Sequence, residues 1–271
     1  MALVKAFLKA GILTEDRRWQ ETSTGTPQGS ILSPLLSNVA LSVLDEHVAA
    51  GPGGPAASPW QRARRRAQGL PNYRLSRYAD DWCLMVHGTR DDAAALRDEI
   101  AGVLSGMGLR LSPEKTLITH IDEGLDFLGW RIQRRRKRGT DKLYVYTYPA
   151  RKAIKSVTGK VKAICRQNTN LPLAILLRRL NSLLRGWTTY FRPGVSSVAF
   201  NYLRAFTWRQ VYRWLRRKHP KRNWKNLRRR VTVDGWWPAD GDVTLFNPGA
   251  VRTTRYRYRG AQIPSPWPST A

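Results

Sequence analysis

The chain has 271 residues, of which 42% are hydrophobic, so it is long enough for one large domain or two ordinary ones with a real core. That composition excludes wholesale disorder. Lys and Arg number 47 against 19 Asp and Glu, and a compact body with the resulting net charge of +28 repels itself. A polyanionic partner is therefore expected: nucleic acid first, an anionic membrane second, with a merely basic, ribosomal-type protein as the plainer reading.

Membrane insertion and export are not indicated by the sequence. No apolar run approaches the roughly 20 residues that span a bilayer, and Lys5 and Lys9 interrupt the region where a signal peptide has its apolar core. The two cysteines, Cys83 and Cys165, cannot form a zinc site alone and suit a reducing compartment. We expect a cytoplasmic protein without a membrane partner.

The first half of the chain alternates turn-rich loops with apolar segments. The predicted elements are a short helix at 1–10, a hairpin arm at 17–24, a loop at 25–30, an apolar helix at 31–48, a flexible connection at 51–59 and a basic run at 61–68. Strands at 75–78 and 82–86 then flank Asp80 and Asp81. A helix with a Thr89/Asp92 capping box follows and ends at Gly108, and further strands are expected at 117–121, 125–132 and 143–148.

Beyond residue 150 the pattern becomes helical. Leucines from 173 to 184 and Trp187 recur at helical spacing, and a second helix is expected at 197–218, with arginines on other faces of both. After Pro220 the sequence indicates a basic, aromatic tail. The predicted fold class is α+β: an antiparallel sheet with packed helices over 1–149, an all-α domain over 150–230, and the tail over 231–271.

Residues 78–81, Tyr-Ala-Asp-Asp, lie between two predicted strands. Nucleotidyl transfer uses two divalent cations about 3.5–4 Å apart, and Mg²⁺ prefers carboxylate oxygens. A tight turn would aim Asp80 while the strands hold it rigid. Taken alone, the tetrapeptide is equally compatible with an ordinary Asp-Asp turn on a basic surface.

Further motifs give a specific resemblance. Residues 25–38 (GTPQGSILSPLLSN), 78–81 (YADD), 108–116 (GLRLSPEKT) and 127–130 (FLGW) resemble, in order, the polymerase motifs of bacterial retroelement reverse transcriptases. Residues 180–191 (LNSLLRGWTTYF) resemble the maturase-specific thumb of group II intron proteins. The chain is therefore identified as similar to the C-terminal part of a group II intron reverse transcriptase/maturase. The resemblance implies a partial palm followed by a helical thumb, the maturase X domain.

The resemblance also implies site residues and a two-ion Mg²⁺ centre. The catalytic residues would be Asp80, Asp81 and Lys115, with the metal on the two aspartates; Gly25, Pro27, Gln28, Gly29 and Tyr78 would bind template or substrate; Phe127, Leu128, Gly129 and Trp130 would grip the primer. Lys115 would neutralise or protonate the leaving pyrophosphate, or else is a solvated lysine. Phe127 and Trp130 are equally compatible with core positions.

One family feature is not found. Reverse transcriptases of this type carry another metal-binding aspartate on an earlier strand, whereas only residues 1–24 precede the Gln28 loop here, and Asp16 follows no apolar strand. We therefore expect the chain alone to polymerise poorly or not at all, and a complementing N-terminal fragment is a possible partner. Two hypotheses follow: an RNA-directed DNA polymerase lacking its N-terminal part, and a non-enzymatic maturase-like cofactor or retroelement relic.

The thumb interleaves cations with aromatic residues, which suits structured RNA with exposed loops. The expected RNA-binding residues are Arg178, Arg179, Arg185, Arg204, Arg213, Arg216, Arg217 and Lys218. For any single one of them, a solvated helix face is the plainer reading. Group II intron RNA is the expected partner, with a DNA target and primer as further ones. No Cys/His cluster follows Pro220, so no metal-dependent nuclease is expected.

Overall fold

The computed structural model describes residues 6, 9, 11–13, 16, 18–20, 33–166 and 169–254. Two compact units divide between Ile118 and Thr119. The domain boundary predicted near residue 150 is where the sequence pattern becomes helical. It stays a prediction about domains. None of the helices in the described ranges is long and apolar enough to cross a bilayer.

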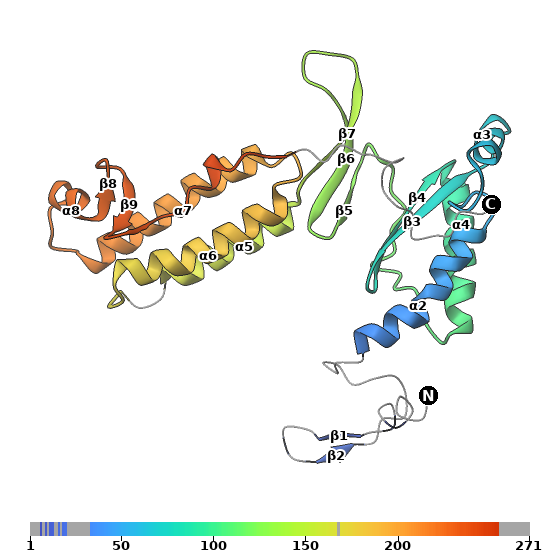
Figure 1. Ribbon diagram of the computed structural model, residues 1–271, viewed down its shortest axis with the longest axis horizontal. Coiled ribbons are helices and arrows are strands. Elements are labelled where there is room, and N and C mark those ends of the chain that lie inside the picture. The colour runs from blue at the N-terminus through green and yellow to red at the C-terminus, as the bar shows by residue number, and fades with distance from the viewer. Residues whose placement is uncertain are drawn as a thin grey trace. The chain divides into compact units, whose positions relative to one another are not determined.

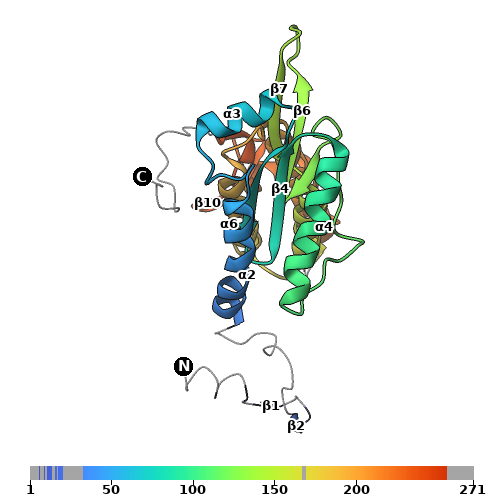
Figure 2. The same ribbon diagram turned by 90° about the vertical axis from the view of Figure 1, so that its right-hand side faces the viewer.

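The first unit consists of a β-hairpin with two helices on one face. Its elements are the short antiparallel pair β1 (Ile12–Leu13) and β2 (Trp19–Gln20), then α2 (Ser33–Ala50), α3 (Pro59–Ala67), β3 (Asn72–Tyr78), β4 (Asp81–His87) and α4 (Arg90–Gly106). Leu44 of α2 and Ile100 of α4 are fully buried against Leu75 and Leu84 of the hairpin. Figure 2 shows α2 and α4 on the same side of β4. Burial of one face of the hairpin fixes its register, because a one-residue slip would expose that face.

Several local predictions for this unit are confirmed. The Thr89 hydroxyl accepts a hydrogen bond from the Asp92 N–H at 3.2 Å, and Asp92 accepts one from the Thr89 N–H at 2.7 Å, so the capping box forms. Gly108 follows the helix with a φ of 74°, as a C-terminal glycine does. The connection at 51–59, expected to be flexible, is instead a packed turn, since Gly53 and Gly54 are buried.

The strand expected at 117–121 is wrong. These residues form no strand, and Leu117 is 77% exposed. An apolar run becomes a strand only where a neighbouring strand satisfies its backbone groups. Here the backbone of the run meets β6 only at its end, where the Ile121 carbonyl accepts from the Arg134 N–H at 2.9 Å, and the His120 carbonyl accepts from the N–H groups of the following turn.

The second unit begins with a three-stranded antiparallel sheet in the order β5 (Leu125–Phe127), β6 (Trp130–Arg136) and β7 (Leu143–Pro149). One strand was expected over 125–132, but the chain reverses at Leu128 and Gly129, whose φ angles are 49° and 79°. Positive φ costs glycine little, so Gly129 permits the reversal. Phe127 therefore pairs with Trp130 across the turn.

Four helices follow: α5 (Arg151–Arg166), α6 (Leu173–Phe191), α7 (Ser197–Lys218) and α8 (Trp224–Val231). The prediction of a helix over 197–218 is confirmed. In Figure 1, α5 and α6 run side by side, and α5 also contacts α7. Their shared core holds the fully buried Leu177, Leu180 and Trp214. Burial raises the pKa of the Cys165 thiol to about 12, which keeps it protonated and unreactive.

The segment after α8 contributes to this core. It forms β8 (Thr232–Val233), β9 (Trp237–Asp240), β10 (Val243–Thr244) and the short η1 (Pro248–Ala250). Leu245 is 2% exposed, and the Asn181 side chain bonds the Thr244 carbonyl at 2.7 Å and the Phe246 N–H at 2.6 Å. The expectation that this segment is only basic, aromatic surface is therefore wrong. The sequence did not reveal its packing, because its apolar residues are too sparse to show a helical or strand period.

Candidate functional site

The paired aspartates lie at the tip of the β3–β4 hairpin. Tyr78 pairs with Asp81, so only Ala79 and Asp80 connect the strands, and Ala79 has a φ of 53°. Asp80 and Asp81 are both exposed. Within the described part of the chain, neither carboxylate takes part in a hydrogen bond or ion pair. The turn therefore presents open oxygen ligands on a short rigid loop.

Arg77, on the buried face of β3, supports the turn. Alternation along β3 places Arg77 on the buried face with Leu75, beside the core helices. Its guanidinium donates from Nε to both carboxylate oxygens of Asp45 in α2, at 2.9 and 3.0 Å. The side chains of Arg77 and Asp45 are only 13% and 20% exposed. Hydrogen bonding to Asp45 raises the pKa of Arg77 against the opposing effect of burial, so the arginine stays charged.

Arg77 also connects two sequence motifs. Its Nη1 donates to the Asn38 side chain at 2.9 Å and to the Ala79 carbonyl at 3.0 Å. Asn38 is the last residue of the 25–38 motif, and Ala79 belongs to the turn itself. The Arg77 side chain thus joins the end of the first motif, which lies in α2, to the backbone of the second motif. Sequence reasoning missed Arg77 and Asp45; a charged residue at an inward strand position was the available signal.

The other predicted residues of the first unit are placed as follows. Tyr78 is 67% exposed directly opposite Asp81. Lys115 is exposed in the turn after α4, where its backbone N–H donates to the Ser112 carbonyl at 3.1 Å. The predicted template-binding residues Gly25, Pro27, Gln28 and Gly29 lie outside the described residues. Their position relative to Asp80 stays a prediction.

The predicted primer-grip residues lie in the second unit, at the β5–β6 turn. The Trp130 ring packs against Phe191 of α6 with ring centres 4.8 Å apart and planes inclined at 59°. The Tyr190 hydroxyl donates to the Leu128 carbonyl at 2.7 Å, and the Gly129 carbonyl accepts from the Ala150 N–H at 2.9 Å. Trp130, Leu128 and Gly129 thus join the hairpin to the helices. Phe127 is half-buried, and a direct primer contact stays a prediction for all four.

The predicted RNA-binding residues differ in what they contact. All except Lys218 are exposed on α6 and α7. Arg185 lies over the Phe246 ring at 4.9 Å. Arg217 donates to the Cys165 carbonyl, and Lys218 donates to the carbonyls of Thr169 and Leu171 at 2.9 and 2.6 Å. Arg217 and Lys218 therefore hold the α5–α6 connection together.

The chain combines a carboxylate pair on a braced hairpin turn with a helical bundle that exposes arginines, which agrees with the resemblance to reverse transcriptases. Residues 1–132 match the reverse transcriptase (RNA-dependent DNA polymerase) family, and residues 154–232 match the group II intron, maturase-specific domain. Together, the two matches identify the chain as similar to group II intron reverse transcriptase/maturases.

Three curated relatives illustrate this similarity. Protein YkfC of Escherichia coli (strain K12) is 38% identical over 167 residues, covering 56% of this chain and 44% of YkfC. Group II intron-encoded protein LtrA of Lactococcus lactis subsp. cremoris is 30% identical over 178 residues, 49% of this chain and 30% of LtrA. An uncharacterized 91 kDa protein in a cob intron of Schizosaccharomyces pombe is 31% identical over 169 residues, which cover 48% of this chain and 21% of that protein. The matched part spans less than half of each relative.

The Arg77 brace leads to a stability prediction. Arg77→Ala leaves the Asp45 carboxylate without its ion-pair partner. We expect the free energy of local opening to fall by about 2–4 kcal/mol, near the lower range for breaking a buried pair. The double variant Asp45→Leu/Arg77→Met should recover most of it, because no charge is left unpaired. Hydrogen exchange of β3–β4 peptides, read by mass spectrometry, measures both. Equal destabilisation by the single and double variants would contradict this account.

Proposed function

We propose that this chain is the palm-and-thumb part of a group II intron reverse transcriptase/maturase. It binds intron RNA to assist splicing and carries the Asp80–Asp81 pair of a metal-dependent polymerase centre. The observation that carries the proposal is the coincidence of the maturase-specific match with a helical bundle whose outer faces are lined with arginine. LtrA, by its name a group II intron-encoded protein, matches the chain over 178 residues.

The helices separate apolar and basic faces. In α6, Leu177, Leu180 and Leu184 are fully buried while Arg178 and Arg185 are exposed. In α7, Arg209, Arg213 and Arg216 follow at spacings of four and three, so they share one face. Cations on such faces neutralise phosphates and release the counterions condensed on nucleic acid. This arrangement supports binding to a folded RNA.

The turn fits Mg²⁺. Asp80 and Asp81 offer exposed, uncommitted carboxylate oxygens, which are ligands of the kind that Mg²⁺ prefers. No group of three or more metal-binding side chains occurs among the described residues. A pair still fits, because Mg²⁺ is usually held by one or two carboxylates together with substrate phosphates. When bound, such ions activate an attacking 3′ hydroxyl and stabilise the leaving group.

The chain's own residues would then orient the two aspartates and neutralise the charge of the nucleotide phosphates. Arg77 fixes the Ala79 carbonyl and so limits where the two aspartates can move. Its charge is already balanced by Asp45, so it braces the turn without competing for the carboxylates. Lys115 is the residue proposed to place a positive charge near the nucleotide phosphates.

RNA binding through α7 is tested with a charge-matched pair of variants. Arg209→Ala/Arg213→Ala/Arg216→Ala should lower the salt slope of binding to a group II intron RNA by about three, one for each phosphate that is no longer neutralised. Arg64→Ala/Arg66→Ala/Arg90→Ala removes the same charge from exposed positions of the first unit and should leave the slope nearly unchanged. Filter binding at several salt concentrations measures both. An equal effect of the two triple variants on the salt slope would contradict RNA binding through α7.

A second candidate function, a splicing cofactor that does not polymerise, is favoured because no third metal-binding side chain joins Asp80 and Asp81 among the described residues. Primer extension on an RNA template separates the two. Extension that Asp80→Asn abolishes would support the enzyme. Stimulated splicing without extension would support the cofactor.

A further inference from the structure

One face of the β6–β7 ribbon carries a row of aromatic rings. The register pairs Arg131 with Tyr148, Gln133 with Tyr146, and Arg135 with Tyr144. Directly paired residues point to the same side of an antiparallel ribbon. The tyrosine face therefore consists of Tyr144, Tyr146, Tyr148, Arg131, Gln133 and Arg135.

The opposite face packs onto the helices at Trp130 and is open further along, where Leu143 and Val145 are 56% and 57% exposed. On that side the Trp130 ring of β6 lies against Phe191 with the ring planes inclined at 59°, and the Thr147 carbonyl of β7 accepts from the Val195 N–H at 2.8 Å. Because successive side chains alternate, the tyrosine face points away from the Trp130 contact. Tyr144 is 46% exposed. Tyr146 and Tyr148 are half-buried, so Tyr144 is the ring of this row that is most open to a ligand.

The tyrosine face is ordered at one end and open at the other. The Tyr148 hydroxyl donates to Gln133 Oε1 at 2.7 Å, and Arg135 Nε donates to the same oxygen at 2.9 Å. The Arg135 guanidinium lies over the Tyr148 ring at 5.4 Å. Tyr144 and Tyr146 are inclined at 53° with ring centres 6.4 Å apart, which is wider than a closed stack.

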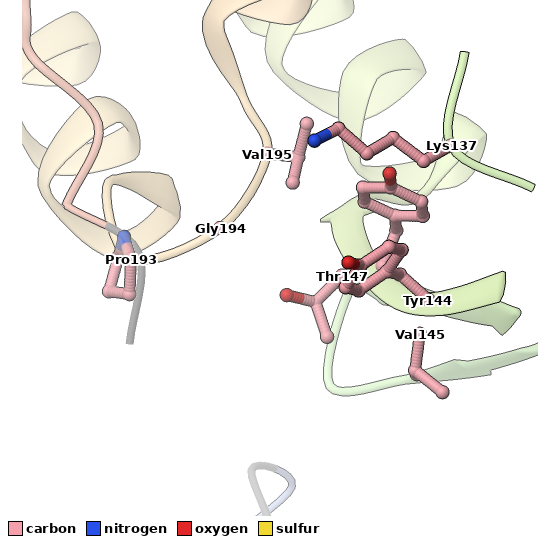
Figure 3. A pocket seen from close by; sticks show the side chains of 8 residues that line it. Lys137, Tyr144, Val145, Thr147, Pro193, Gly194 and Val195 are labelled. Carbon is pink, nitrogen blue, oxygen red and sulfur yellow. The ribbon is translucent and has the colours of Figure 1, made fainter. Parts of the chain in front are cut away.

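A hollow of about 350 Å³ lies beside the open end. Residues 144–147 of β7, Tyr144 and Tyr146 among them, line the hollow together with residues 193–195 and Lys137 (Figure 3). Figure 3 shows the Lys137 side chain extending towards Val195. The volume falls within the range of about 300–1,000 Å³ that is usual for small-ligand sites. The hollow thus joins aromatic surface to an ammonium group.

We propose that the tyrosine face and its hollow bind an unpaired segment of RNA. Bases would stack on Tyr144 and Tyr146, while Lys137 and Arg135 would contact the adjoining phosphates. This inference rests on the proposed RNA-binding function and names the RNA element that this surface takes. Stacking on a side chain requires a base whose face is free, which a continuous duplex does not offer.

The chemistry of the neighbouring chain favours this ligand. Residues 134–138 are all Arg or Lys. Two of these cations are paired, Arg134 with Asp122 at 2.6 Å and Arg136 with Asp141 at 2.9 Å. Aromatic rings beside such a run are the combination found where proteins hold single strands: cations follow the backbone and rings receive the bases.

The test compares Tyr144→Ala with Tyr144→Phe in the full chain. The probe is a fluorescent ten-nucleotide RNA without secondary structure. Loss of one stacking platform should weaken its binding roughly 5- to 100-fold, whereas the phenyl ring should keep it within about twofold. Leu143→Ala, at a neighbouring position of β7 that is 56% exposed, is the matched control and should have no effect. A blunt RNA duplex should bind Tyr144→Ala and the native chain equally.

Two results would overturn the inference: an equal loss for Leu143→Ala and Tyr144→Ala, or a Tyr144→Ala loss that is the same for duplex and single strand. Its failure differs from failure of the proposed function. If the native chain binds intron RNA but Tyr144→Ala leaves the ten-nucleotide affinity unchanged, only the tyrosine face is rejected. If the native chain binds no RNA, the proposed function itself is rejected.

Discussion

Raising the salt concentration from roughly 50 to 200 mM is expected to weaken binding of intron RNA on the order of 10²- to 10³-fold. The net charge of +28 supplies the attraction, and each neutralised phosphate releases counterions whose entropy gain falls as salt rises. About six phosphate contacts, at a slope of roughly −0.7 to −0.9 each, give this range. Filter binding at several chloride concentrations measures the slope.

The structure indicates which cations to count. Seven of the predicted residues are exposed on α6 and α7, and six of them remain when Arg217 is set aside: Arg178, Arg179, Arg185, Arg204, Arg213 and Arg216. Arg217 and Lys218 already hold backbone carbonyls of the α5–α6 connection and should contribute little. Circular dichroism at both salt concentrations is the control for folding. A slope shallower than about −2 would show that the positive charge is not used on RNA.

Local sequence signals predicted the helices well because their determinants lie close together in the chain. The Thr89/Asp92 capping box joins residues three apart, and the helix over 197–218 follows from its own apolar spacing. The strand expected at 117–121 failed because a strand requires a partner, and a single apolar run does not show one. The reversal at Gly129 was hidden within an apolar stretch.

The candidate site shows the same division. The sequence singled out Asp80 and Asp81 because adjacent acids between two apolar strands are visible locally. It did not single out Arg77, whose partner Asp45 lies 32 residues earlier on another element. Such a pair exists only once the helix packs on the hairpin, so the inward strand position of Arg77 could signal a buried charge but could not identify Asp45 as its partner. The tyrosine face likewise depends on the β6–β7 register.

Replacing Trp214 by alanine is expected to destabilise the helical unit by about 3–5 kcal/mol, the usual cost of emptying a buried aromatic site. Trp214 is 0% exposed and lies in the core with Val211 and Leu215. The Lys218 ammonium lies 5.1 Å from its ring centre, so the ring also supports the residue that holds the α5–α6 connection. Urea unfolding followed by far-ultraviolet circular dichroism measures the loss.

Trp214→Phe distinguishes cavity formation from hydrogen bonding. Among the described residues, the buried indole Nε1 of Trp214 has no hydrogen-bond partner, which costs about 1–3 kcal/mol in the native chain. Phenylalanine removes that N–H while leaving a smaller cavity, so we expect Trp214→Phe to cost less than half as much as Trp214→Ala. Val198→Ala, on the same helix at 80% exposure, should stay within about 0.5 kcal/mol. Equal losses for the phenylalanine and alanine variants would mean that the indole N–H is satisfied.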